Sequence, residues 1–472
     1  MNSLKALITL CAAQFMVILD ISVVNVALPS IQTDLGIEMA DLQWVITTYT
    51  LAFGGLLLLG GKAADIFGRR RMFLIGLGAF TLASVGASLA ESSTTLLAAR
   101  ALQGVGAAML SPAALSLVTV TFPEGPERHR ALAAWAAVAA SGGAVGVLVG
   151  GILSETMSWP AIFLINLPVG VAVFFAALRV VPADDAPAAR GGLDATGALL
   201  ATGSLVALIY GLVEAPEAGW LSTQTLGLAG LAAVGLSAFA LVESRSEDPL
   251  VDLAVFRKRP TVTALLLMIA GMGTVLSAFF FISIYLQQVL GYSALETGLQ
   301  FLPGALALIV TAHLGGHLVA HLGAKPVLAT GMLLAAAGTW LLSGIATGGS
   351  YVADVLPGLM VMDVGLGLAA SGIYITAMSG VGDHEAGSVS GLVSTSHEIG
   401  VALVLPVLST VAVSGIDTHG AGIAGLDPAT MTSGLADGFS AAALISIGAA
   451  LLAVVALRRS DVAKGTQGGF AH

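Results

Sequence analysis

Apolar runs of about 20 residues recur along the chain, and they constrain its fold more than any other feature. A run of this length crosses about 30 Å of hydrocarbon as an α-helix. Lipid offers no hydrogen-bond partner to the backbone, so a chain that spans it must form helices or a closed barrel. The runs are continuously apolar rather than alternating in polarity, which excludes the barrel. The sequence therefore predicts an all-α membrane protein.

The composition supports the same class. The chain has 472 residues, of which 57% are hydrophobic and 10% are charged. A soluble domain carries about 25% charged residues, so this chain lacks the polar side chains needed to cover a water-facing surface. The net charge of −10 comes largely from acids in the predicted external loops, while the cytoplasmic loops are basic. That pattern indicates apposition to a lipid bilayer and no nucleic-acid partner.

Fourteen transmembrane helices are predicted from the apolar runs. With a cytoplasmic N-terminus, every Lys and Arg except Arg100 lies on the cytoplasmic side or at the helix ends facing it. A missed or added helix would place basic clusters on the wrong side, so this distribution supports the count and puts both termini in the cytoplasm. The predicted spans are Leu4–Leu28, Trp44–Gly61, Phe73–Leu89, Leu96–Val120, Ala131–Leu153, Ala161–Val181, Leu193–Leu212, Thr225–Val242, Val262–Ile284, Gly298–Val319, Val327–Ala346, Val355–Met378, Val389–Val413 and Phe439–Leu457.

The loop lengths divide the chain. The two longest cytoplasmic loops, residues 182–192 and 243–260, lie on either side of spans seven and eight. We therefore expect two six-helix bundles with an inserted two-helix hairpin. The predicted units are an N-terminal bundle (1–181), a linker with two additional helices (182–259), a C-terminal bundle (260–457) and a cytoplasmic tail (458–472).

The loop after span two combines glycines, an acid and three arginines. A degenerate copy follows span ten, as is typical of transporters with duplicated halves. Asp65 can accept from backbone N–H groups and the arginines can pair with it or with a facing helix, which would latch one conformation. The alternative is that the arginines only orient the hairpin. The candidate latch residues are Gly61, Asp65, Gly68, Arg69, Arg70 and Arg71.

Five motifs in chain order resemble those of the major facilitator superfamily, specifically its fourteen-span drug:proton antiporters. They are Leu19-Asp20 with Asn25 and Leu28-Pro29, the loop just described, Arg100 to Gly106, Trp159 to Gly170, and Tyr285 to Ser293. The resemblance implies a monomer in the bacterial cytoplasmic membrane that moves a small molecule together with protons and needs no cofactor. The residues it makes candidates for the substrate cavity are Asn25, Tyr49, Gln103, Asn166, Tyr285, Gln287 and Glu398.

Ionisable side chains inside the predicted spans are the sharpest functional signal, because each costs about 2.5–3.5 kcal/mol at the bilayer centre. Asp20 in span one and Arg100 in span four lie at compatible depths, counting about 1.5 Å per residue. We expect them to approach one another. A conformational change that alters this contact would load or release a proton at Asp20, as a proton-coupled carrier requires. The alternative is a static structural pair.

Two further acids complete the candidate proton-coupling set. Glu398 in span thirteen has His397 beside it and no other cation within the second-half spans, so it is expected to be protonated or to meet substrate or water. Members of the resembling family carry acids near this helix that handle protons or cationic drugs. Asp363 in span twelve stands where those proteins usually have a small residue, so it either marks substrate specificity or lines water.

Span five is rich in glycine at spacings that let two helices approach closely. The resembling antiporters have a proline where this chain has Val147, so the kink and the export direction that their motif implies stay open here. Simple helix packing is the alternative. The glycines are Gly142, Gly146, Gly150 and Gly151.

Three classes of function compete. A secondary transporter explains the spans, the repeat and the buried charges together. A membrane enzyme would need a catalytic cluster, and the sequence has neither a Ser/His/Asp motif nor a P-loop, while His313, His317 and His321 lack nearby Cys or carboxylate partners for a metal. A channel would more often repeat a pore loop. The predicted function is proton-coupled export of small amphipathic or cationic compounds by alternating access; export of one dedicated metabolite and proton-coupled uptake are the alternatives.

Overall fold

The computed structural model describes residues 2–37, 44–123, 125–182, 195–246, 249, 251, 253–382, 386–413 and 427–458. Within these ranges the chain is helical apart from short connections, and no strand occurs there. Thirteen of the described helices are long and apolar enough to cross a membrane. Helix α6 (Pro126–Thr156), with 31 residues at the position of the predicted fifth span, completes the fourteen. The all-α membrane fold is confirmed.

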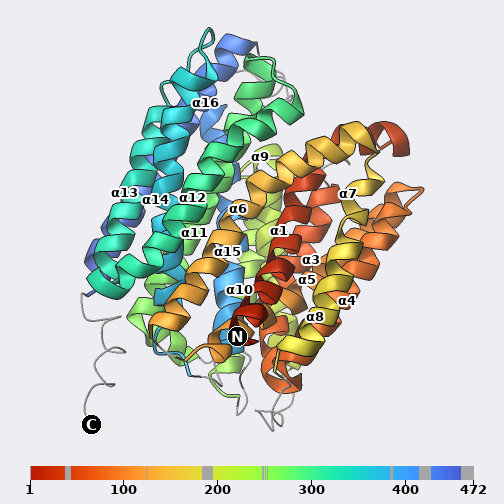
Figure 1. Ribbon diagram of the computed structural model, residues 1–472, viewed down its shortest axis with the longest axis vertical. Helices are drawn as coiled ribbons and strands as arrows, with labels where there is room; N and C mark the ends of the chain where they lie inside the picture. Colours follow the sequence, from red (N-terminus) through yellow and green to blue (C-terminus); the bar gives the residue numbers. More distant parts are fainter. Residues whose placement is uncertain are drawn as a thin grey trace.

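The helices gather into two groups, with α6, α9 and α15 between them (Figure 1). The N-terminal helices are α1 (Asn2–Leu35), α3 (Trp44–Phe67), α4 (Arg69–Ser88), α5 (Ser93–Thr121), α6, α7 (Pro160–Leu164) and α8 (Asn166–Val180). The inserted hairpin is α9 (Ala195–Ala218) and α10 (Thr223–Glu243), followed by the 3₁₀ turn η1 (Leu253–Arg257). The C-terminal helices are α11 (Arg259–Ile284) with the π-turn η2 (Tyr285–Val289), α12 (Ala294–Leu322), α13 (Ala324–Leu342), the π-turn η3 (Tyr351–Val355), α14 (Leu356–Ala377), α15 (Ala386–Ala412) and α16 (Pro428–Ala456).

One helix starts well before its predicted span. α16 begins at Pro428 rather than Phe439, because the Asp427 side chain caps it by accepting from the backbone N–H groups of Ala429 and Thr430. The earlier start places the carboxyl of Asp437 inside the helix, where the sequence-based span had left it outside the membrane. Its side chain is exposed.

Two helix pairs join the bundles. α6 packs along α12, from Leu148 against Gly298 near one end to Ala133 against Gly316 near the other. α3 packs against α15, and α9 lies against both of these helices. The contact between the bundles therefore has two seams, and the inserted hairpin covers one of them.

The hairpin touches both bundles near the predicted external surface. The ring of Trp44 on α3 stacks on Tyr210 of α9 with centroids 5.8 Å apart. In the turn between α9 and α10, the indole N–H of Trp220 donates to Thr410 Oγ1 of α15 at 2.8 Å. The inserted helices are thus tied to the N-terminal bundle through α3 and to the C-terminal bundle through α15.

The predicted internal repeat is visible in the backbone. Gly68, between α3 and α4, has φ 99°, and Gly323, between α12 and α13, has φ 83°. Glycine enters this left-handed region without the steric penalty that a side chain would meet. The two loops therefore turn in the same unusual way, and each needs glycine to do so.

Candidate functional site

A closed polar network lies inside the N-terminal bundle and joins α1, α4, α5 and α8. Arg100 Nη1 donates to Asp20 Oδ2 at 2.5 Å. Gln103 Nε2 and Asn166 Nδ2 donate to Asp20 Oδ1 at 3.0 and 2.8 Å. Ser84 Oγ accepts from both amides. The structure thus brings together the two charges that the sequence placed at compatible depths, and we call these five residues the Asp20 network.

The Asp20 network is shut off from water. The side chains of Asp20 and Arg100 are both 0% exposed. Further hydrogen bonds stabilise a buried ion pair. Here the two amides donate to Asp20 and the Val45 carbonyl accepts from Arg100 Nε at 2.9 Å, while Arg100 Nη2 makes no hydrogen bond to the described residues. The guanidinium also lies 4.5 Å from the ring centroid of Tyr49, a cation–π contact. In this conformation a proton reaches Asp20 only if these helices separate.

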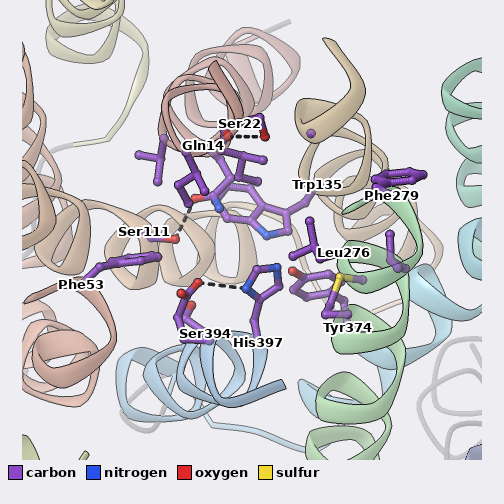
Figure 2. Close-up of a pocket in the computed structure, with 17 residues that line it drawn as sticks. Gln14, Ser22, Phe53, Ser111, Trp135, Leu276, Phe279, Tyr374, Ser394 and His397 are labelled. Carbon is purple, nitrogen blue, oxygen red and sulfur yellow. Dashed lines mark hydrogen bonds and ion pairs between the residues drawn. The ribbon is translucent and has the colours of Figure 1, made fainter. Parts of the chain in front are cut away.

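A cavity of about 70 Å³ lies between the two bundles (Figure 2). One water occupies about 30 Å³, whereas pockets for drug-sized ligands measure about 300–1,000 Å³. The bundles are therefore closed around this space in the present conformation. Its polar and aromatic lining includes Gln14, Phe53, Ser111, Trp135, Phe279, Tyr374, His397 and Glu398.

Polar and aromatic side chains from both bundles form the cavity wall. On the N-terminal side, Ser111 Oγ donates to Gln14 Oε1 at 2.7 Å. Trp135 on α6 and Tyr374 on α14 line the cavity from the two sides of the seam. These four residues were not predicted from the sequence. Polar side chains within apolar spans were the available signal for Gln14 and Ser111, whereas nothing in the sequence distinguishes the two aromatic residues.

Glu398 supplies a carboxyl group to the cavity. His397 Nδ1 lies 3.0 Å from Glu398 Oε1, and the side chains are 21% and 6% exposed respectively. Figure 2 shows the imidazole pointing toward Trp135 and Tyr374. An imidazolium beside a carboxylate is electrically balanced, and loss of one proton leaves a net negative charge facing the cavity. His397, which the sequence placed next to Glu398, can therefore supply a positive charge beside this carboxyl group when its imidazole is protonated.

The other predicted cavity residues lie elsewhere. Gln103 and Asn166 do not line this cavity because their amides are held by the Asp20 network. Tyr49 is 0% exposed and packs on the Arg100 guanidinium. The sequence placed these three near the transported molecule, whereas the structure uses them to surround the buried charges.

The remaining candidates are spread more widely. Tyr285 and Gln287 lie in η2 at the end of α11, where the Tyr285 hydroxyl donates to a backbone carbonyl at 2.7 Å. Asp363 is fully buried in the C-terminal bundle and does not line the cavity. The side chain of Asn25 lies outside the described residues.

The candidate latch connects the two bundles. Asp65 Oδ1 accepts from Arg69 Nη2 at 3.2 Å, and Asp65 Oδ2 accepts from the backbone N–H of Ser388 in the first turn of α15 at 3.1 Å. Arg70 instead bonds within its own bundle, donating to the Leu178 carbonyl at 2.6 Å. The bond between Asp65 and the first turn of α15 thus connects this loop with the other bundle across the seam.

Lys62, inside the loop signature, makes a second long-range contact. Its Nζ donates to the carbonyl of Pro249 in the connection that leads from α10 to α11.

The predicted glycines of span five lie where α6 packs on α1. Gly142 and Gly146 face α1 so closely that a Cβ on either would stand 2.6 Å from an α1 side chain. Gly150 and Gly151 are also buried.

Comparisons with known proteins agree with this architecture. A family model described as Major Facilitator Superfamily matches residues 10–405. The cephamycin export protein CmcT of Amycolatopsis lactamdurans is 41% identical over 461 residues, covering 96% of this chain and 93% of that protein. The puromycin resistance protein pur8 of Streptomyces alboniger is 39% identical, covering 95% and 89%. The chain belongs to the Major Facilitator Superfamily, and it is a multi-pass membrane protein.

A solved structure shows the same fold at low sequence identity. The human organic anion transporter MFSD10 superposes with a TM-score of 0.67 at 14% identity, covering 96% of this chain and 99% of that one. Such a likeness concerns the arrangement of the helices alone. The family and the curated relatives are transporters, and the resemblance stated from the sequence motifs is confirmed.

Proposed function

We propose that this protein exports small amphipathic or cationic compounds in exchange for protons, by alternating access of the cavity between the bundles. Two curated relatives are named for the export of, or resistance to, an antibiotic, which supports export as the direction. The observation that carries the proposal is a cavity that draws its lining from both bundles and contains one carboxyl group.

The lining suits a cation with an apolar body. Glu398, beside His397, offers a negative charge to the cavity when its carboxyl group is ionised. The faces of Phe53, Trp135 and Phe279 offer apolar area and cation–π contacts. In the present conformation the cavity holds only a few waters, so a drug-sized molecule requires the bundles to move apart.

Proton coupling belongs to the same proposal. The Asp20–Arg100 pair is stable only while its amide partners remain in place, so movement of α1 against α5 would leave Asp20 without its counter-charge and favour proton uptake. Inward proton movement then supplies the work of export, with about 2.3 kcal/mol per charge for each 100 mV of membrane potential. Asp65 with the α15 N-terminus stabilises the conformation closed at that end.

The test uses purified protein in liposomes, with ethidium as the cationic probe and chloramphenicol as the neutral one. We expect an imposed pH gradient to drive ethidium transport by the wild type. Asp20→Asn should abolish the pH dependence while the protein stays folded, and Glu398→Gln should reduce ethidium transport more than chloramphenicol transport. Glu127→Gln, an exposed acid in the first turn of α6, is the matched control. Full pH-driven activity of Asp20→Asn would remove Asp20 as the coupling site.

Export of one dedicated metabolite is the second candidate. It is favoured by the names of the two relatives, each of which refers to a single antibiotic, cephamycin or puromycin. A panel of antibiotics tested in a pump-deficient host separates the two. Resistance to several unrelated compounds supports the broad exporter, and resistance to one compound supports the dedicated exporter.

A further inference from the structure

Each bundle contains an equivalent crossing of two helices, and the two crossings provide a common reference for comparing positions in the bundles. α4 crosses α5 where Gly76 meets the Gly106 carbonyl, and α13 crosses α14 where Gly331 meets the Gly365 carbonyl. In both places a Cβ on either glycine would overlap backbone atoms of the facing helix. Positions on α5 and α14 can therefore be matched by counting back from Gly106 and Gly365.

This comparison shows that the C-terminal bundle has no counterpart of Arg100 at the matching position. Arg100 lies six residues before Gly106, and the residue six before Gly365 is Leu359. Gln103, three residues before the crossing, corresponds in the same way to Met362. The C-terminal bundle is thus apolar where the N-terminal bundle holds the polar partners of Asp20.

An acid nevertheless stands next to this apolar position. Asp363, two residues before Gly365, is 0% exposed, and neither of its carboxyl oxygens has a hydrogen-bond partner among the residues that the structure describes. Its Oδ2 lies in the space that a Cβ on Gly304 of α12 would occupy. In the N-terminal bundle the matching residue is Gly104, packed against the α3 backbone at Tyr49. A glycine on α12 therefore makes the room that the carboxyl needs on α14.

Among the described residues, no opposite charge pairs with Asp363. Tyr351, at the start of the same helical segment, uses its hydroxyl to donate to the Gln300 carbonyl at 2.7 Å. On α12, Glu296 is held in the N-terminal capping box, and His313 lies nine residues beyond Gly304, about 13 Å along the helix.

Among the other elements packed against α14, α15 carries His397 and Glu398, which line the cavity together with Tyr374, eleven residues beyond Asp363 on α14. The remaining charges described here lie near helix ends. Asp354 of η3 accepts from the backbone N–H of Ser350. Arg259, at the start of α11, donates to the Val455 carbonyl, and Lys325 lies at the start of α13. An ionised carboxylate that is buried without a cation or a hydrogen bond is strongly disfavoured, so Asp363 holds its proton in this conformation.

We propose that Asp363 is an additional proton-binding site, separate from both the cavity and the Asp20 network. It is loaded while α12 and α14 touch at Gly304. When that contact opens to water, the carboxyl O–H bond breaks, the proton passes to a water molecule and the carboxylate remains hydrated. The cycle then exchanges one more proton than the cavity carboxyl and Asp20 exchange alone. This inference rests on the proposed proton-coupled export.

The first measurement is infrared spectroscopy of the protein in lipid. The carbonyl band of a protonated carboxyl group should lose intensity in Asp363→Asn, which keeps the volume and removes the acid. Asp437→Asn, which removes an exposed acid on α16, is the matched control and should leave the band unchanged. Asp363→Glu should retain a protonated carboxyl band at a shifted frequency. An unchanged band in Asp363→Asn would show that Asp363 is not protonated and would overturn the proposal.

The second measurement is the number of protons exchanged per ethidium, taken from the opposing ethidium gradient that just stops pH-driven transport in liposomes. We expect this ratio to fall by one proton in Asp363→Asn and to be restored in Asp363→Glu. If the wild type couples to the pH gradient and Asp363→Asn keeps the full ratio, only the proton site at Asp363 is refuted. If the wild type itself shows no coupling, the proposed function is refuted.

Discussion

The bond between Asp65 and α15 offers a direct measure of how the bundles are held closed. Asp65→Asn keeps an amide oxygen near the Ser388 N–H but removes the charge that faces a helix N-terminus. A hydrogen bond to a charged group contributes about 1.5–3 kcal/mol, and a neutral one about 0.5–1.5. The substitution should therefore cost the closed conformation about 1–2 kcal/mol, which changes the ratio of closed to open molecules by a factor of about 5–30.

Spin labels report this ratio. Ile75 on α4 and Val455 on α16 are exposed and belong to different bundles, and the single native thiol can be removed by Cys11→Ser. We expect the distance distribution between the labels to gain a longer component in Asp65→Asn. Glu127→Gln, which also removes one exposed acid, is the control and should leave the distribution unchanged. A distribution identical to that of the wild type would refute the assignment of Asp65 as a latch.

Two further predictions concern stability. In Gly106→Ala the new Cβ would stand 2.6 Å from the Phe80 backbone nitrogen. This overpacking should cost about 1–3 kcal/mol of stability and lower the thermal unfolding midpoint in detergent. Gly78→Ala, which has open space around the new Cβ, is the control and should not lower the midpoint. Hydrogen bonds from Thr430 hold the pKa of Asp427 below its ordinary 3.8. The cap of α16 is therefore complete above about pH 4 and is lost as the pH falls further. Hydrogen exchange of the first turn of α16 should accelerate in acid, and Asp427→Asn should remove that pH dependence.

The sequence predicted the fold well because the rule behind it is physical and local. Any apolar run long enough to cross lipid must satisfy its own backbone, so each run becomes a helix wherever it packs. The end of a helix follows other rules. α16 was predicted to start at Phe439 because its first residues are too polar for a span, whereas the Asp427 cap and Pro428 extend the helix beyond the apolar run.

The contacts of the site could be predicted from the sequence only where the depth of a charged residue in the membrane determines its partner. Asp20 and Arg100 had to find one another, since neither is stable alone inside the membrane. Whether Gln103 or Asn166 faces the cavity or the buried charges depends on how far each helix is rotated, which one sequence does not determine. That Trp135 and Tyr374 line the same cavity from different bundles depends on helix rotation in the same way.

The buried acids of the two bundles differ in what surrounds them, and this difference bears on where protons move. Asp20 has a cation and two amides within hydrogen-bond distance, so its charge is already compensated. Glu398 has one imidazole, which can itself lose a proton, and Asp363 has no hydrogen-bond partner in the described parts of the chain. The acids with the weakest compensation respond most to small movements, because a single new water or cation changes their balance. We therefore expect the C-terminal bundle to bind and release protons early in the cycle, and Asp20 to follow only once its network opens.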